Sequence, residues 1–543
     1  MTMRGDDIHL GKKINDILDE LSEEEFDSDF TSDTEDNVEY QSDHNSEISD
    51  SELSGKSDDE ESDSETLQGK NGHSWTKKAP PASRTPARNL VLRIPGPRGR
   101  ARSIQTEVES WEILFSEDMV ECITVHTNEE IERQAQKYSE SVHFVGKTDK
   151  DEIKALIGLL YISGEQKDNH LKSTEMWSCF GAIIYCSIMS ESRFRFLINC
   201  LRFDDKERRN YEEKFFPIRG LWASFIDKCT SAYTPHEYLT IDEQLLGFRG
   251  NCPFRVYISN KPDKYGMKIV TMCDARTYYM VNAIPYVGKV VLRGSESVPS
   301  YYVKKLSEPV HGTGWNITCD NWFTSIPLAD TLLKEQKLTI VCTLRKNKRE
   351  IPSSFLSDRK KQVLSSQFAL HGEKMLVSFC PKKGKSVIML STMHQNEEID
   401  EESKKPEVIL FYNCTKGGVD TFDQLTHNYT VARKTRRWPL RFFYGMLDQA
   451  AINAFILYKI AKKQKPPPRR SFLKVLGLEL ARPHLLKRLQ KPIPRELVST
   501  IHKVLGTEET VNQTPAPAKV QKRSRCAICP RNKDRKTQIS CIK

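Results

Sequence analysis

The sequence predicts a mixed α/β protein in which a strand-rich core is flanked by helical segments. Three observations lead to this prediction. Apolar residues recur at helical spacing within residues 107–236. Short β-like runs then alternate with turn residues and one helix between residues 237 and 345. A long apolar helix is expected at 439–462. Helices on both sides of a strand-rich stretch indicate a layered α/β architecture.

The net charge of +8 is the sum of two unlike parts of the 543-residue chain. Residues 1–70 contain 24 acidic and 5 basic side chains, so the rest of the chain has a net charge of +27. A strongly basic body favours a polyanionic partner, either nucleic acid or an anionic membrane surface. The best apolar runs, around residues 155–163 and 450–458, are much shorter than the roughly 20 residues that cross a bilayer. These runs therefore exclude a membrane-spanning helix, and no membrane partner is expected.

The first 106 residues divide by composition into two segments. Residues 1–74 are rich in Ser, Asp and Glu and poor in apolar residues, which predicts a disordered acidic tail. Residues 75–106 are expected to be a basic, proline-rich linker or an arm along a phosphate backbone. The tail is either a solubilising extension or a phosphorylated segment that competes with DNA for the basic body.

Residues 107–236 are expected to be mostly helical. Thr148 and Asp151 resemble a capping box, and Ile153 and Leu156 follow at helical spacing. Nothing in this stretch indicates catalytic chemistry.

Short β-like runs separated by turn residues characterise residues 237–345, the expected first part of the core. One run leads into Asp242 and another ends in Asp320. The predicted elements are strands at 239–241, 268–273, 278–284, 316–319 and 338–344, and a helix from Ser325 to about residue 337.

Residues 346–406 are polar and basic, and we expect them to interrupt the core as a β-rich insertion. A further strand is predicted at 408–412. A helix is predicted after Gly418, and it places Asp420 and Asp423 on one face because residues three apart are neighbours on a helix.

Three carboxylates, those of Asp242, Asp320 and Asp420, lie where a compact α/β layer can bring them together. Asp423 follows one helical turn after the third. Mg²⁺ prefers oxygen ligands, and two such ions can activate the attacking oxygen and stabilise the leaving oxygen of a phosphoryl transfer. For each aspartate taken singly, a turn or capping role is the competing interpretation.

Six sequence motifs resemble the transposases of the piggyBac superfamily, and they look closest to those of the founding insect element. They are YLTIDEQLLGFRG at 238–250, KPDKYGMKIVTMCD at 261–274, NITCDNWFTSIPL at 316–328, REIP at 349–352, YNCTKGGVDTFDQ at 412–424 and RKTRRWP at 433–439. The resemblance covers about residues 107–462 and continues faintly to the C-terminus. Several long motifs in the same order are far more specific than three spaced aspartates.

This resemblance implies a ribonuclease-H-like catalytic core with a β-rich insertion, flanked by a mostly helical dimerisation and DNA-binding domain. It implies that Asp242, Asp320, Asp420 and Asp423 are catalytic, and that the first three bind two Mg²⁺ ions. The implied segments are 107–236 and 430–508 for the helical domain, 237–345 and 407–429 for the core, and 346–406 for the insertion.

The function implied by the resemblance is cut-and-paste DNA transposition. The expected partners are double-stranded DNA, as transposon ends and TTAA targets, and a second copy of the chain; no small-molecule substrate is expected. The expected location is the nucleus. The alternative is a domesticated, catalytically silent protein that binds DNA or chromatin with the same fold.

A site that cleaves a phosphodiester also needs cations, and basic residues follow the first and last aspartates in the sequence. We expect these residues to contact DNA phosphates, and the alternative is that they form a solvated charged face. They are Arg249, Arg255, Lys261, Lys264, Lys268, Arg433, Lys434, Arg436 and Arg437. Trp438 either stacks on an unpaired base or anchors the next helix in the core, and the core role is favoured.

Four other residues are candidates by type alone, and none is predicted to be catalytic. His236 and Asp263 are interpreted as surface or turn residues, and Asp274 as a hairpin residue. Glu243 is expected to face away from Asp242, because side chains alternate along a strand.

Residues 509–543 form a basic tail with an incomplete cysteine-rich zinc module. Cys526, Cys529 and Cys541 supply three ligands, whereas a structural zinc site needs four. Either the tail is truncated and disordered, which is the favoured interpretation, or its zinc site is completed in trans.

Overall fold

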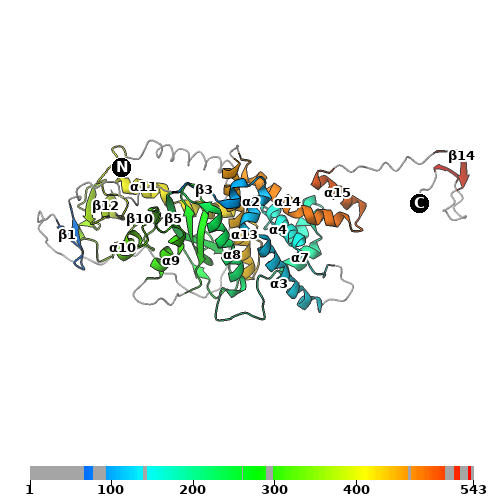
Figure 1. Cartoon of the computed structure of the whole chain (residues 1–543), viewed down its shortest axis with the longest axis horizontal. Helices are drawn as coiled ribbons and strands as arrows, with labels where there is room; N and C mark the ends of the chain where they lie inside the picture. The colour runs from blue at the N-terminus through cyan, green and yellow to red at the C-terminus, as the bar shows by residue number, and fades with distance from the viewer. Residues whose placement is uncertain are drawn as a thin grey trace.

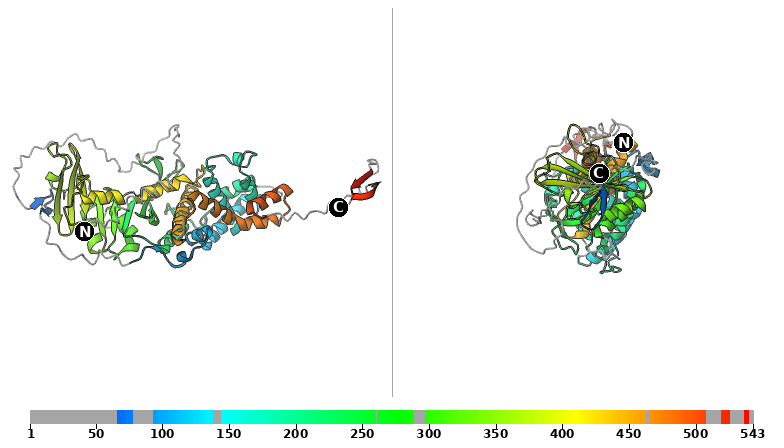
Figure 2. Two further views of the ribbon diagram at one scale, coloured as in Figure 1. Left: turned by 90° about the horizontal axis from the view of Figure 1, so that it is seen from above. Right: turned by 90° about the vertical axis from the view of Figure 1, so that its left-hand side faces the viewer.

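The computed structural model describes residues 66–77, 93–137, 144–259, 261–288, 297–462, 466–507, 519–525 and 536–539. Figure 1 shows most strands at one end of an elongated molecule and most helices at the other. Seen from above in Figure 2, the two parts follow one another along the long axis. The prediction of a mixed α/β protein is confirmed. No described helix has both the length and the apolar character needed to cross a bilayer.

One mixed sheet forms the strand-rich part. Its strands follow the order β1-β2-β11-β12-β13-β10-β9-β5-β7-β6, and β8 also pairs with β7. The strands are β1 (Thr66–Gln68), β2 (Ser74–Thr76), β5 (Tyr238–Gly247), β6 (Val256–Tyr257), β7 (Tyr265–Asp274), β8 (Met280–Pro285), β9 (Asn316–Cys319), β10 (Thr339–Thr343), β11 (Ser366–His371), β12 (Lys374–Lys382) and β13 (Lys385–Ser391). The strands β5, β9 and β10 are parallel neighbours, and all other pairs in this sheet are antiparallel.

The predicted hairpin is formed by β7 and β8, and the predicted strands at 316–319 and 338–344 are β9 and β10. The helix predicted after Ser325 is α10 (Ile326–Lys334), and the Ser325 hydroxyl caps it by accepting a hydrogen bond from the Leu328 amide. Strand β7 is buried along nearly its whole length, because α9 (Val298–Ser307) and α12 (Gly418–Asn428) both pack against it.

The expected insertion continues the sheet instead of standing apart from it. Strand β13 pairs with β10, and β12 and β11 follow outward. The strand predicted at 408–412 is wrong: these residues belong to helix α11 (Glu407–Thr415). Pro406 precedes the first turn, and Val408, Phe411 and Thr415 are buried at helical spacing. A five-residue apolar run does not distinguish a strand from a buried helix.

The prediction of disorder is also wrong for residues 66–74. Strands β1 and β2 form an antiparallel hairpin, and Thr76 pairs with Leu370 on β11, so the hairpin extends the sheet at its outer edge. The Trp75 side chain is fully buried.

The helical part combines segments from both sides of the core, and its helices from residue 107 to 236 confirm the predicted helical character. They are α2 (Glu107–Leu114), α3 (Glu117–Ala135), α4 (Lys150–Glu165), α5 (Ser173–Met176), α6 (Ile183–Ile188), α7 (Glu191–Cys200) and α8 (Phe216–Ala232), joined later by α13 (Trp438–Ala461), α14 (Arg469–Leu489) and α15 (Arg495–Leu505). The cap of α4 is Asp149, which accepts from the Glu152 amide, instead of the predicted Thr148.

Helices α4 and α14 approach unusually closely. A Cβ atom on Gly158 would lie 2.3 Å from the carbonyl oxygen of Gly477, so glycine is required at this crossing. The contact joins residues that lie on opposite sides of the core in the sequence.

The remaining described elements are short. They are 3₁₀ turns at Gly99–Ser103, Glu308–Val310 and Ser353–Phe355, and two-stranded pairs β3 (Gly96–Pro97) with β4 (Tyr233–Thr234) and β14 (Lys519–Arg525) with β15 (Lys536–Ile539). The zinc prediction for Cys526, Cys529 and Cys541 lies outside the described residues.

Candidate active site

The register of two parallel strands brings Asp242 and Asp320 together. Strand β5 pairs with β9 up to Ile241, which lies opposite Cys319, and each aspartate is the next residue of its chain segment. Asp242 therefore lies inside β5, which continues to Gly247, and not at a strand end as predicted.

Helix α12 covers the face of β5 that carries Asp242. Thr240 and Gln244 share this face because alternate side chains of a strand point the same way. Gln244 donates a hydrogen bond to the hydroxyl of Thr426 on α12, at 3.3 Å. A Cβ atom on Gly418 would lie 2.6 Å from the Thr240 hydroxyl, so glycine allows the start of α12 to lie directly on the strand.

The first turns of α12 add two more carboxylates, which meet a lysine from the loop before β7. The Lys261 ammonium lies 3.1 Å from Asp420 Oδ1 and 3.7 Å from Asp423 Oδ2. Burial lowers the pKa of Lys261, but the charges of Asp423, Asp420 and Asp242 outweigh burial and raise it. The structure thus brings the predicted aspartates to one place.

The electrostatics of this cluster are unfavourable for ionised carboxylates. Burial, the charge of Glu243 and a hydrogen bond with it, and then the charges of Asp320 and Asp420, raise the pKa of Asp242 well above its usual range. Burial and the charge of Glu243 raise the pKa of Asp320 to about 6, although the Trp322 amide donates to its carboxylate. The cluster holds more negative charge than its neighbours balance.

Two residues beside the cluster differ from the sequence interpretation. Glu243 alternates with Asp242 along β5, yet its carboxylate is near enough to influence both Asp242 and Asp320. Lys268 was predicted to contact DNA, but its side chain is only 2% exposed. Its ammonium lies 4.0 Å from the centre of the Trp322 ring and 4.0 Å from a Glu243 oxygen. Lys268 therefore balances charge from beneath the site and cannot reach a phosphate.

The donor set fits a hard divalent cation. The three candidate ligands, Asp242, Asp320 and Asp420, are carboxylates. Beside them, the Oδ1 atom of Asp423 is buried without a hydrogen-bond partner. As the side chains of the described residues stand, no three metal-binding groups converge closely enough to hold an ion. A cation that replaced the Lys261 ammonium would relieve the repulsion among the carboxylates.

Comparison with known proteins agrees with the motifs. The family model described as Transposase IS4 matches residues 106–455. The fold matches the cryo-EM structure of a piggyBac transposase synaptic complex with hairpin DNA, with a TM-score of 0.75 and 42% identity over 83% of this chain and 96% of that one. The chain belongs to the piggyBac transposase family.

More distant human relatives belong to the same family. PiggyBac transposable element-derived protein 3 is 24% identical over 381 residues, which are 66% of this chain and 62% of that protein. PiggyBac transposable element-derived protein 2 is 20% identical over 374 residues, 64% and 61% of the two chains. The matched region thus spans somewhat less than two thirds of each of these curated relatives.

Two of the arginines that this piggyBac-family chain was predicted to offer to DNA serve the fold instead. Arg433 donates to the carbonyl oxygen of Leu171 at 2.7 Å. Arg437 donates to the carbonyl oxygens of Ile198 and Asn199, each at 3.0 Å, near the end of α7. These guanidinium groups tie the segment after α12 to the helical part.

Trp438 takes the core role that the sequence favoured. Its ring stacks on Phe215 and meets Phe254 edge-on, with a centroid distance of 4.9 Å for the second pair.

Arg255 is half-buried and donates to the carbonyl oxygen of Arg249 at 3.0 Å, so it stabilises its own loop. The basic residues that are exposed, and for which contact with DNA stays a prediction, are Arg249, Lys264, Lys434 and Arg436.

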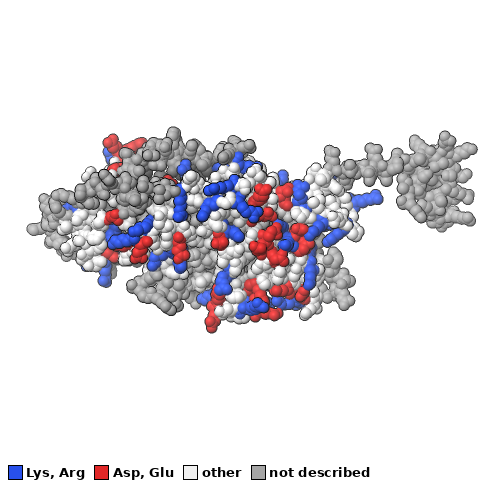
Figure 3. All heavy atoms as spheres, in the orientation of Figure 1, with Lys and Arg blue, Asp and Glu red and all other residues white. Residues whose placement is uncertain are grey.

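The remaining candidates are structural. Asp274 ends β7 and is completely buried, where its Oδ2 atom accepts hydrogen bonds from the His236 amide at 2.9 Å and from the Tyr233 hydroxyl at 3.0 Å. The Oδ2 atom of Asp263 lies 4.0 Å from Nε2 of His427, and this neighbour lowers the pKa of Asp263. Figure 3 shows acidic and basic side chains intermixed on the face in view, so the basic body presents no uniform positive surface there.

Proposed function

We propose that this chain is a divalent-metal-dependent DNA transposase that cuts DNA strands at transposon ends and joins them to a TTAA target. The observation that carries the proposal is the proximity of Asp242, Asp320 and Asp420, whose charges act on one another in a half-buried cluster with uncompensated negative charge. Such a cluster is costly unless cations occupy it, and clusters of this kind mark functional sites.

The chemistry follows from the positions of the side chains. Bound Mg²⁺ would supply activation of the attacking oxygen and stabilisation of the leaving oxygen of a phosphodiester. Asp242, Asp320 and Asp420 would bind two such ions through carboxylate oxygens. Asp423, one turn along α12 and largely buried, would orient the neighbouring carboxylate and the Lys261 ammonium. Lys261, released from Asp420 by the cations, would then balance the charge of a phosphate in the cleft.

Double-stranded DNA is the proposed substrate. The structural relative that is 42% identical was solved as a synaptic complex with hairpin DNA. Arg249, Lys264, Lys434 and Arg436 offer exposed cations on the two segments that follow β5 and α12. A ribonuclease-H-like core, dimerisation through the helical part and a nuclear location belong to the same proposal.

Strand cleavage tests this function directly. A DNA with TTAA-flanked transposon ends is incubated with the wild-type chain or with Asp320→Ala, in Mg²⁺ or in EDTA. Cleavage is expected only for the wild type in Mg²⁺. Asp118→Ala, which removes an exposed carboxylate on α3, is the matched control and should cleave like the wild type.

Equal cleavage by Asp320→Ala, or cleavage in EDTA, would contradict the proposed site. DNA binding without any metal-dependent cleavage would instead support the alternative of a catalytically silent DNA-binding protein.

A further inference from the structure

The N-terminal hairpin contacts the loop that follows β10, far from it in the sequence. The indole nitrogen of the buried Trp75 donates to the carbonyl oxygen of Glu350 at 2.8 Å. The Asn71 amide donates to the carbonyl oxygen of Arg349 at 3.3 Å, and Gly69 forms an isolated β-bridge with Pro352. The hairpin therefore contacts the backbone of this loop at three residues, Arg349, Glu350 and Pro352.

The fit between hairpin and loop is close. A Cβ atom on Gly69 would lie 2.6 Å from the carbonyl oxygen of Glu350, so no other residue could take this place without moving the backbone. On the other side of the hairpin, the His73 ring lies 4.3 Å from the ring of His371 on β11. The hairpin is thus docked by specific contacts along both of its flanks.

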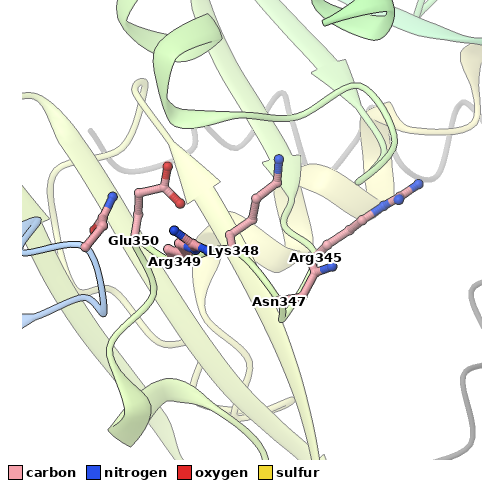
Figure 4. Close-up of a pocket in the computed structure, with 6 residues that line it drawn as sticks. Arg345, Asn347, Lys348, Arg349 and Glu350 are labelled. Carbon is pink, nitrogen blue, oxygen red and sulfur yellow. The ribbon is translucent and has the colours of Figure 1, made fainter.

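The loop that the hairpin holds is strongly basic. Together with Asn71 it surrounds a hollow of about 350 Å³, which is lined by Arg345, Asn347, Lys348, Arg349 and Glu350. In Figure 4 the side chains of Arg345 and Lys348 extend away from the loop. Arg345, Lys346, Lys348 and Arg349 place four cations within five residues, and their mutual repulsion disfavours a conformation that gathers them at one site. Contacts from outside the loop can offset this repulsion.

We propose that the hairpin Thr66–Thr76 is an N-terminal clamp that holds residues 345–352 in the conformation in which their cations bind a DNA phosphate. The choice of DNA as the ligand rests on the proposed function, whereas the ordering of the loop by the hairpin rests on the contacts alone. Trp75 is then a positioning residue, because it acts on DNA only through the backbone of the loop. Because the hairpin pairs with β11, its turn lies beside the hollow, and Asn71 forms part of the lining.

Two variants of the full-length chain test the clamp. Trp75→Ala removes the anchor, and Gly69→Ala introduces a clash with the backbone of Glu350. Hydrogen exchange should become at least tenfold faster in residues 345–352 in both variants and stay unchanged in α4 and α13. Gly146→Ala is the matched control, because a Cβ atom there meets no atom within 4 Å. Unchanged exchange in residues 345–352 would overturn the clamp.

The same variants test the link to DNA. The dissociation constant for a TTAA-containing duplex should rise about tenfold in Trp75→Ala, while the rate of strand cleavage at saturating DNA stays within twofold of the wild type. Trp75→Phe, which keeps the ring but loses the hydrogen bond to Glu350, should give an intermediate constant. Faster exchange with unchanged affinity would overturn the phosphate site and leave the clamp. If the wild type binds no DNA, the proposed function is overturned. Hydrogen exchange in residues 345–352 would then still show whether the hairpin orders the loop.

Discussion

Half-buried charges occur in two regions of the molecule, and their surroundings differ. In the segment after α12, the guanidinium groups of Arg433 and Arg437 donate to carbonyl oxygens that are fixed by the fold. In the active site, burial and neighbouring like charges raise the pKa of Asp242 and Asp320. Arginines that donate hydrogen bonds to carbonyl oxygens stabilise the fold, whereas carboxylates that repel one another favour the binding of a cation.

The largest effect on the free energy of unfolding is expected when Arg437, whose guanidinium group has hydrogen-bond partners, is removed. Arg437→Ala leaves the carbonyl oxygens of Ile198, Asn199 and Leu201 without their donor, and we expect a loss of about 4 kcal/mol in the free energy of unfolding. Chemical denaturation measures this loss. A loss below about 1 kcal/mol would show that water replaces the guanidinium and that the contrast between the regions is weaker than argued.

Removal of the Asp320 carboxylate, which lies among like charges, should instead increase the free energy of unfolding. The pKa of Asp320 is about 6 in the fold and near 3.8 in the unfolded chain, so its ionisation costs stability as the pH rises through 6. Asp320→Asn should therefore gain roughly 2–3 kcal/mol at pH 8 in EDTA, and the gain should vanish near pH 4. Denaturation at several pH values tests this. A destabilisation that is equal at every pH would contradict the electrostatic cause.

The Lys261 ammonium should compete with a metal ion for the carboxylates of the site. Lys261→Met removes the ammonium beside Asp420 and Asp423, so Mn²⁺ should bind about tenfold more tightly in the absence of DNA, a difference of about 1.4 kcal/mol. Electron paramagnetic resonance of free Mn²⁺ gives the affinity. Lys264→Met, an exposed neighbour, is the control and should bind Mn²⁺ like the wild type. Weaker binding in Lys261→Met would mean that the ammonium helps to shape the site.

The smallest effect on stability is expected at Arg436, the exposed arginine beside the half-buried Arg437. Arg436→Ala should change the free energy of unfolding by no more than about 0.5 kcal/mol. If Arg436 contacts a phosphate, the slope of log affinity for DNA against log salt should fall by about one. Binding measured at several salt concentrations decides this, and an unchanged slope would exclude the contact.

Local sequence patterns predicted most of the elements around the site. Turn residues separate the apolar runs that become β7, β8, β9 and β10, and Ser325 marks the start of α10. The aspartates were recognised through family motifs, because acidic residues after strands are common. Asp242 and Asp320 become neighbours because Ile241 pairs with Cys319, and no local pattern specifies the register of two parallel strands that are separated by other elements.

Tertiary contacts account for what the sequence could not predict. Between Arg433 and Arg437 the sequence contains only basic residues and one threonine, so composition cannot tell which side chains are half-buried and which are exposed. That difference arises from carbonyl oxygens elsewhere in the helical part, at Leu171 for Arg433 and in α7 for Arg437. The apolar run at 408–412 fits a strand or a helix equally well until its neighbours are known. The docked hairpin was hidden by the polar composition around it, and Trp75 was its only sequence signal.

The position of that hairpin also sets an order of events during synthesis. The Thr76 hydroxyl donates to the Leu370 carbonyl across 294 residues of sequence. A ribosome that adds roughly 5–20 residues per second needs roughly 15–60 s to supply that partner. Throughout this interval the tryptophan of the nascent hairpin has no site to enter and is open to chaperones. The hairpin is therefore made well before the strand on which it docks.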